Sequence, residues 1–367
     1  MKKEFSRRRE KTKELYKRFS AKAKTGVFLY GAGFIGRWSV GYLEQLGIPV
    51  LGFIDSDTSK WGAIICGKKI HSPLDPNVIK TKAVFITSRH SVSPIKQALS
   101  HLSAIIMSID AFVVHQVGED LIAKTEDVFK WEKQSLETFH SVLCAMLDGN
   151  TKPLESVADN RRFFDRFGFF NRDKEIFVDA GAYVGDSLEQ FIWSVNGVFQ
   201  KIYAFEPGGI QFAALKRRVN RLISEWALKP DRIDLVNRGL GSANSICKLL
   251  NSDVLIQTQI DSYTGRKDSN KSLTSIRSVS LDNYFKAEPF SFLKVDVEGS
   301  EHALIEGAKN SIQKHRPRIA LSVYHYPTDI FTLPLKCSEL NADYTFALGH
   351  HSSQLMDTVA YLRDKND

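Results

Sequence analysis

Side chains able to do acid–base or binding chemistry follow the ends of four predicted strands in the second half of this 367-residue sequence. Asp179 follows the run 175–178, Glu206 and Pro207 follow 201–205, Asp296 and Glu298 follow 292–295, and His325 follows 318–323. The carboxyl ends of parallel strands lie at one edge of a sheet, where α/β proteins bind their ligands. The pattern therefore predicts one ligand site lined by these side chains.

A glycine turn follows the first of these strands. In Asp179-x-Gly181-x-x-x-Gly185, glycine permits a sharp turn and a close approach of the backbone to a ligand. Asp179 before the turn and Asp186 after it disfavour a phosphate and favour a ligand with a cationic amino group and a sulfonium. Glu206 is placed to accept hydrogen bonds from both hydroxyls of a ribose. Together these features favour S-adenosylmethionine over NAD at this site.

Two successive α/β series must position these residues. Short apolar runs alternate with helical stretches over 25–115, and a longer series covers 173–367. Residues 116–172 lack strand signals and predict a helical connector. The alternation predicts an α/β fold with two tandem Rossmann-like domains, each built on a parallel sheet. The polar stretch 252–278 predicts a surface insertion in the second domain.

Residues 163–362, more than half of the chain, resemble the FkbM family of S-adenosylmethionine-dependent methyltransferases. The resemblance is carried in order by FVDAGAYVGDSLEQF at 177–191, IYAFEP at 202–207, SLDNYF at 280–285, FLKVDVEGSEHALIEGA at 292–308, RPRIALSVYH at 316–325, and a closing group of Tyr344, His350 and 359–361. It implies a class I methyltransferase fold that O-methylates hydroxyls, often on sugars of natural products or on surface glycans. One departure is Tyr183, where many methyltransferases have a glycine, so the turn is more crowded.

Residues for each role follow from the motifs and the resemblance together. The predicted cofactor site consists of Asp179, Gly181, Tyr183, Gly185, Glu206 and Pro207. Methyl transfer to a hydroxyl is an in-line displacement, which an enzyme can assist by removing the hydroxyl proton. The resemblance makes Asp296 and Glu298 the best candidates for acceptor positioning or for the general base. Glu301 lies in the same cluster, but Ser300 and Glu301 can also form a helix-capping box.

His325 completes the predicted catalytic group. It could act as a base, hold the acceptor, or serve as a hydrogen-bonded structural histidine. Asp296, Glu298 and His325 could also hold a divalent metal. No ligand spacing in the sequence requires a metal, so the predicted site contains none.

A second glycine motif lies in the first domain. Gly31-x-Gly33-x-x-Gly36 follows the run 27–30 and opens a helical stretch, and Asp55 comes 24 residues after Gly31. This context is typical of a dinucleotide site, so NAD(P) or a nucleotide sugar is one interpretation. The domain is short, however, and lacks a second mononucleotide-binding half. It also resembles small nucleotide-sugar-binding or CoA-binding-like units that precede sugar-modifying domains. A scaffold that orients or dimerises the enzyme is the alternative.

Residues 1–24 carry the whole net charge of the protein. They contain eleven Lys and Arg against three Glu, a balance of +8, and the rest of the chain has 39 basic and 39 acidic residues. Thr12, Leu15, Tyr16 and Phe19 form one face of a predicted basic amphipathic helix. The helix could pack on its own domain, dock a partner, or lie on an acidic surface such as a membrane. Because the charge is confined to this segment, no specific nucleic-acid binding is predicted.

The leading prediction is an S-adenosylmethionine-dependent O-methyltransferase that acts on a hydroxyl of a sugar, glycan or glycan precursor, either alone or as a homo-oligomer. The four cysteines are far apart, which favours a reducing, cytoplasmic setting. No apolar run approaches the ~18 residues of a membrane helix, so contact with the inner face of a membrane would be peripheral. The alternatives are an NAD(P)-dependent nucleotide-sugar oxidoreductase or epimerase that uses the first domain, and a non-enzymatic adaptor that uses the basic helix.

Overall fold

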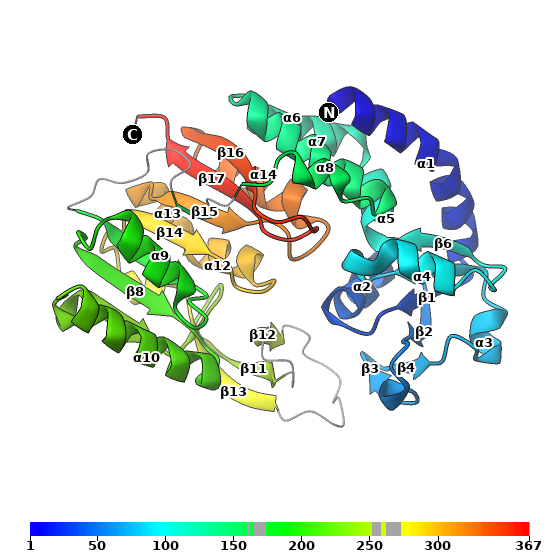
Figure 1. Cartoon of the computed structure of the whole chain (residues 1–367), viewed down its shortest axis with the longest axis horizontal. Helices are drawn as coiled ribbons and strands as arrows, with labels where there is room; N and C mark the ends of the chain where they lie inside the picture. Colours follow the sequence, from blue (N-terminus) through cyan, green and yellow to red (C-terminus); the bar gives the residue numbers. More distant parts are fainter. Residues whose placement is uncertain (160–161, 165–173, 252–257, 262–272, 367) are drawn as a thin grey trace.

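Two α/β domains make up the protein, and a set of helices connects them (Figure 1). The computed structural model describes residues 1–159, 162–164, 174–251, 258–261 and 273–366. In Figure 1 the first domain lies at the right and the second at the left, with the connecting helices above them. The two separate parallel sheets confirm the predicted α/β class with tandem domains.

The first domain contains a six-stranded sheet in the order β3-β4-β2-β1-β5-β6. Its strands are β1 (Val27–Tyr30), β2 (Val50–Ile54), β3 (Ile64–Ile65), β4 (Lys68–His71), β5 (Ala83–Ile86) and β6 (Ile105–Ser108). All neighbours are parallel except β3, which forms an antiparallel hairpin with β4. The apolar run 27–30 predicted β1, and the apolar runs 50–54, 83–87 and 104–108 predicted β2, β5 and β6. The hairpin was not predicted, because its two strands are short and mixed in polarity.

Helices cover both faces of this first sheet. They are α1 (Lys2–Ala23), α2 (Phe34–Gln45), α3 (Pro76–Ile79), α4 (Val92–Ala98) and α5 (Ile109–Gln116), with the 3-10 turns η1 (Thr58–Lys60) and η2 (Arg89–Ser91). Successive strand residues point to opposite faces, so each face has its own core. One core, which includes Phe19 and Phe53, lies under α1, α2 and α5. The other, which includes Phe28 and Ile95, lies under α3 and α4.

Helix α1 belongs to the body of the protein. Phe19 on the predicted apolar face is fully buried, and Thr12 and Tyr16 contact His115 on α5. Arg8 also forms an ion pair with Asp148 of the connector. Of the three predicted uses of this helix, the structure shows packing on its own chain. An amphipathic pattern alone cannot distinguish that use from binding to a partner.

We expect Phe19→Ala to lower the free energy of unfolding by about 3–5 kcal/mol, because it removes a fully buried aromatic ring from the core. Lys17→Ala, which changes an exposed residue on the same helix, is the control and should change stability by less than about 0.5 kcal/mol. Urea denaturation followed by circular dichroism measures both. Equal stabilities for the two variants would show that α1 is a detachable tail.

The second domain is built on a seven-stranded sheet in the order β16-β17-β15-β14-β7-β8-β9. Its strands are β7 (Ile176–Ala180), β8 (Lys201–Phe205), β9 (Ile233–Val236), β14 (Phe292–Val295), β15 (Arg318–Ser322), β16 (Tyr344–His350) and β17 (Thr358–Asp364). The first five are parallel, and β17 is antiparallel to both of its neighbours. The carboxyl ends of β7, β8, β14 and β15 therefore meet at one edge, as the sequence predicts.

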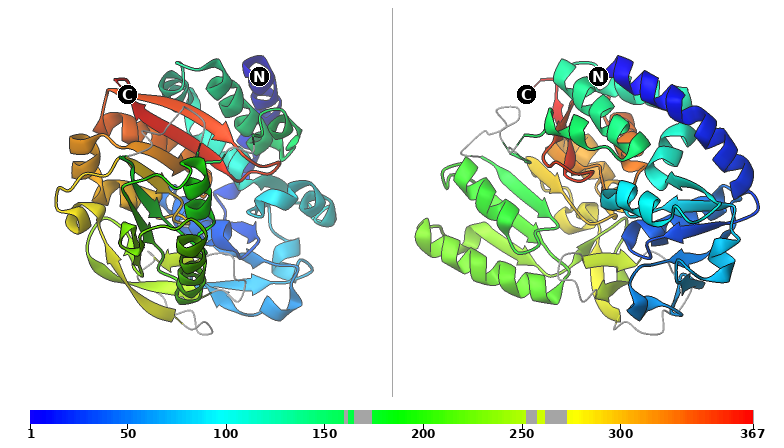
Figure 2. Two further views of the ribbon diagram at one scale, coloured as in Figure 1. Left: turned by 60° about the vertical axis from the view of Figure 1, so that its left-hand side comes forward. Right: turned by 45° about the vertical axis from the view of Figure 1, so that its right-hand side comes forward.

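Helices cover both faces of this second sheet as well (Figure 2). They are α9 (Asp186–Ser194), α10 (Gly209–Glu225), α11 (Leu281–Phe285), α12 (Glu301–Gly307), α13 (Lys309–His315) and α14 (Asp329–Leu340), with the 3-10 turn η3 (Pro230–Arg232). Phe191 and Leu215 pack α9 and α10 on one face. Leu304 and Phe331 pack α12 and α14 on the other.

A small separate sheet begins before the predicted insertion 252–278 and includes the described parts of it. It has the order β10-β13-β11-β12, with β10 (Gly239–Leu240), β11 (Ser245–Asn251), β12 (Thr258–Asp261) and β13 (Leu273–Val279). The sequence predicted an insertion here but no strands, since this stretch is polar. Residues 252–257 and 262–272 lie outside the described residues.

Three helices form the described part of the predicted connector. They are α6 (Gly118–Val128), α7 (Lys133–Asp148) and α8 (Lys152–Glu155). Helix α7 contacts α1 and α5 of the first domain and β16 of the second, so it holds the two domains together. Residues 160–161 and 165–173 of this segment lie outside the described residues. In the part of the chain that the structure describes, no helix combines the length and apolarity needed to cross a membrane.

Candidate active site

A cavity of about 340 Å³ opens at the carboxyl ends of β7, β8 and β14. Six residues predicted from the sequence line it, namely Gly181, Tyr183, Glu206, Pro207, Asp296 and Glu298. The other three predicted residues of this site, Asp179, Gly185 and His325, lie behind the wall rather than on it. The volume is within the range typical of small-molecule sites.

The turn between β7 and α9 brings the backbone to the edge of this cavity. Gly181 has a φ of 81°, and a Cβ atom there would lie 1.9 Å from the carbonyl oxygen of Asp296. Gly185 has a φ of 87°, and a Cβ atom there would lie 2.8 Å from Leu215. Both positions therefore require glycine. Between them Tyr183 adopts a left-handed φ of 48°, and its side chain is exposed.

Glu206 holds the cavity end of the turn through its carboxylate. Its two oxygens accept hydrogen bonds from the backbone N–H groups of Tyr183 (2.9 Å) and Gly208 (2.7 Å). The side chain is almost fully buried, and this burial raises the pKa of Glu206 to about 7 against the opposing effect of the two N–H groups. Each carboxylate oxygen keeps a free lone pair, so Glu206 can accept two further hydrogen bonds.

Lys294 is a residue of this site that the sequence interpretation missed. Its Nζ atom lies 3.0 Å from Asp179 and donates to the carbonyl oxygen of Gly181 at 2.6 Å. Although burial disfavours its charge, Asp179 and Asp296 raise the pKa of Lys294, so it is protonated. The fully buried Asp179 thus anchors the glycine turn through Lys294 and does not face the cavity. A lysine inside the apolar strand 292–295 was the signal in the sequence.

Arg162 fixes Asp296 on the opposite wall. Its guanidinium donates to one oxygen of Asp296 at 2.8 Å and pairs with Asp357 at 2.9 Å, and the Tyr324 hydroxyl donates to the other oxygen of Asp296 at 3.2 Å. Burial opposes ionisation of Asp296, but Arg162 lowers its pKa below the ordinary value. Asp296 is therefore an anion with a fixed position. It is well suited to orient a hydrogen-bond donor, and it is a weak base.

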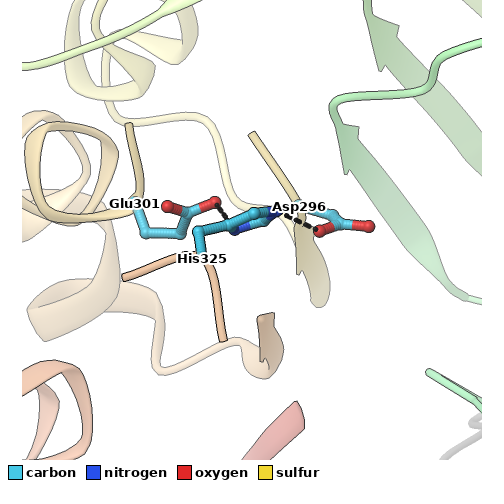
Figure 3. A group of neighbouring side chains, drawn as sticks. All are labelled: Asp296, Glu301 and His325. Atoms are coloured by element: carbon cyan, nitrogen blue, oxygen red, sulfur yellow. Dashed lines mark ion pairs between the residues drawn. The ribbon is translucent and has the colours of Figure 1, made fainter. Parts of the chain in front are cut away.

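His325 lies between carboxylates of the segment 296–301, which joins β14 to α12 (Figure 3). Its Nδ1 atom is 2.9 Å from Glu301, and its Nε2 atom is 3.4 Å from Glu298 and 3.6 Å from Asp296. Burial disfavours the charged ring, but Glu301 and Glu298 raise the pKa of His325 well above its ordinary value. These neighbours therefore favour the protonated imidazolium, which is a poor base. Glu298 lines the cavity beside this ring, and its role as a general base stays a prediction.

Asp296, Glu301 and His325 each offer one potential metal-ligand atom, and these atoms lie within 4.8 Å of one another. In the structure the imidazolium already supplies a positive charge at this point, and Glu301 also accepts the Val297 N–H at 2.9 Å. Two carboxylates and one imidazolium leave one negative charge, which Arg162 offsets through its ion pair with Asp296. The predicted absence of a metal stays a prediction.

The glycine motif of the first domain has a packing explanation. A Cβ atom on Gly36 would lie 2.1 Å from the carbonyl oxygen of Gly31, so this residue permits close contact between helix and turn. Around Gly33 no atom lies within 4 Å of such a Cβ. Asp55 pairs with Lys60 at 3.1 Å. The motif is thus formed as predicted, whereas a bound NAD(P) or nucleotide sugar stays a prediction.

Residues 179–359 match the family model described as the methyltransferase FkbM domain, a stretch that includes every cavity residue named above except Arg162. The chain therefore carries an FkbM methyltransferase domain. The match confirms the predicted family and the predicted class of enzyme, an S-adenosylmethionine-dependent methyltransferase. None of the curated proteins matches the sequence.

A solved structure shows the fold of this chain in another protein. The crystal structure of methyltransferase FkbM from Methylobacillus flagellatus KT is similar over 99% of both chains, with 19% identity and a TM-score of 0.60. Two more distant matches are fibrillarin from Aeropyrum pernix with natively bound S-adenosyl-L-methionine (9% identity, 52% and 66% coverage of this and that chain, TM-score 0.32) and UDP-D-quinovosamine 4-dehydrogenase from Vibrio fischeri (24% identity, 25% and 84%, TM-score 0.21). Only the first is similar enough to support the fold, and it covers both domains.

Proposed function

We propose that the protein transfers the methyl group of S-adenosylmethionine to a hydroxyl of a sugar, glycan or glycan precursor. The observation that carries this proposal is the charge of the cavity wall. Five carboxylates outnumber three basic side chains there: Asp186, Glu206, Asp296, Glu298 and Asp357 against Arg162, Arg238 and Lys294. Such a wall favours a cationic cofactor and a neutral, hydroxyl-rich acceptor, and disfavours a phosphorylated ligand.

The residues around the glycine turn fit this cofactor. S-adenosylmethionine supplies an electrophilic methyl group on a sulfonium sulfur. Glu206 would accept hydrogen bonds from the ribose hydroxyls through its free lone pairs. Gly181, which has no side chain, lets the turn pack against the carbonyl oxygen of Asp296 at the edge of the cavity. Lys294 keeps the turn in this conformation through its hydrogen bond to Gly181. The cofactor wall of the cavity therefore has its shape without a ligand.

The opposite wall would handle the acceptor and its proton. Asp296, which Arg162 and Tyr324 hold in place, would accept a hydrogen bond from a hydroxyl and orient it. Glu298 lines the cavity and would take the proton of the reacting hydroxyl. His325, protonated and 3.4 Å from Glu298, would hold that carboxylate in place.

Cofactor affinity should rise with pH through about 7. Glu206 accepts two ribose hydrogen bonds when ionised, and its pKa is about 7, so the carboxylate form dominates at pH 8 and the weaker-binding acid form at pH 6. The ionised fractions predict roughly tenfold tighter binding of S-adenosylhomocysteine at pH 8 than at pH 6. Calorimetric titration at both pH values measures this, with Glu206→Gln as the control. If the control keeps the same pH dependence, another group is responsible.

The acceptor can be found by isotope labelling. Cells with and without the gene are grown on methionine with a trideuterated methyl group, and their glycans and glycan precursors are compared by mass spectrometry. We expect a labelled methyl ether that is present only when the protein is present. Label that depends on the protein but appears on lipid, protein or RNA instead would show that the acceptor is not a sugar.

A further inference from the structure

One buried arginine of the first domain contacts the backbone of the loop that carries His325. Arg89, in η2 directly after β5, donates from Nη1 to the backbone carbonyl of Tyr324 at 2.5 Å. Its other nitrogens bind Asp110 at 2.8 and 2.7 Å. Arg89 and Asp110 are both buried, so this arginine has a fixed position. The bond therefore holds the peptide group that joins Tyr324 to His325.

Aromatic residues of the glycine-motif helix make a second contact with the same loop. Phe34, the first residue of α2, stacks on Tyr326 with ring centroids 4.9 Å apart, and Trp38 stacks on it at 5.3 Å. Phe34 also meets His325 edge-on at 6.4 Å. The glycine turn before α2 thus places an aromatic ring against the loop 324–326.

Phe34 also contacts the turn that carries the predicted base. Gly299, next to Glu298, has a φ of 92°. A Cβ atom at Gly299 would lie 2.5 Å from the Tyr326 hydroxyl and 2.9 Å from Phe34. One ring of the first domain therefore packs against both turns of the acceptor wall, the turn with Glu298 and the loop with His325.

We propose that the first domain is a brace that fixes these two turns, with Arg89 and Phe34 as positioning residues for Glu298 and His325. The inference rests on the proposed role of Glu298, and it assigns a role to the glycine motif that needs no nucleotide. The charged hydrogen bond of Arg89 fixes the backbone of the loop. The stack of Phe34 on Tyr326 fixes the outer side of the loop 324–326.

The variant Arg89→Lys tests this brace in the full chain. Lysine keeps a positive charge beside Asp110, but its single ammonium group lacks the planar fork that serves Asp110 and Tyr324 together. We expect backbone amides at 323–328 to exchange hydrogen about tenfold faster than in the wild type, with residues 177–185 unchanged. The pKa of the His325 ring, measured by NMR, should fall, since the ring would lose its fixed position between Glu298 and Glu301. Arg18→Lys on the exposed side of α1 is the matched control.

A second variant, Phe34→Leu, keeps an apolar side chain but removes the stack, and should accelerate exchange at 323–328 in the same way. Exchange at 323–328 equal to that of the control in both variants would overturn the brace. Equal acceleration at 323–328 and 177–185 would overturn it too, because Arg89 would then act only on general stability. Neither readout depends on a ligand. A wild-type protein that fails to bind S-adenosylhomocysteine therefore refutes the proposed function separately.

Discussion

Glu206→Ala should weaken the binding of S-adenosylhomocysteine by at least about a hundredfold. The substitution removes a carboxylate that would accept two ribose hydrogen bonds, and bonds to a charged group contribute about 1.5–3 kcal/mol each. It also leaves the backbone N–H groups of Tyr183 and Gly208 without their partner, which loosens the glycine turn. Calorimetric titration at pH 8, where Glu206 is ionised, gives the clearest comparison.

The matched control for this loss is Glu288→Ala. Glu288 is exposed and precedes β14, so it lies at the opposite edge of the sheet from the cavity. The Glu288→Ala substitution should leave the affinity for S-adenosylhomocysteine within about twofold of the wild type. An affinity of Glu206→Ala within threefold of the wild type, with an unchanged melting temperature, would show that Glu206 does not hold the ribose.

Glu298→Gln should lower kcat by about a thousandfold and leave the affinity for S-adenosylhomocysteine almost unchanged. Glutamine has the size of glutamate but cannot take up a proton, and general-base catalysis contributes about 10²–10⁴ in rate. The cofactor contacts come from the other wall, so they should persist. Single-turnover transfer of a labelled methyl group to the acceptor found by mass spectrometry measures this step.

Two further variants make this result specific. Glu306→Gln changes a carboxylate on α12 that pairs with Lys336 outside the cavity, and it should keep full turnover. Asp296→Asn should chiefly raise the KM for the acceptor, because Asp296 orients the hydroxyl in the proposed mechanism. Full turnover in Glu298→Gln would remove Glu298 as the base, and loss of turnover in Asp296→Asn alone would transfer that role to Asp296.

The placement of the cavity residues could be predicted because sheet topology brings strand ends together. Glu206, Asp296 and Glu298 follow parallel strands, and each lines the cavity. The local turn geometry decides which strand-end side chains point into the core and which into the cavity. The burial of Asp179 and His325 could therefore not be predicted from the sequence. The ion pair of Arg162 with Asp296 joins residues 134 positions apart, and no local pattern in the sequence connects them.

Two patterns in the first domain were genuinely ambiguous in the sequence. Gly31 and Gly36 are needed for close packing of α2 whether or not a nucleotide binds, so the glycine motif cannot distinguish a ligand site from a scaffold. The contact of Phe34 with Tyr326 joins the two domains, and only the folded chain reveals it. Likewise, the apolar face of α1 has the same sequence pattern for packing inside the chain as for docking a partner.

The most direct test of the central claim is calorimetric titration of the wild-type protein with S-adenosylhomocysteine and, in parallel, with NADH. We predict one S-adenosylhomocysteine site per chain with a dissociation constant on the order of micromolar, and no binding heat from NADH. Binding of NADH at that affinity, with no binding of S-adenosylhomocysteine, would contradict the account and support an oxidoreductase that works through the first domain.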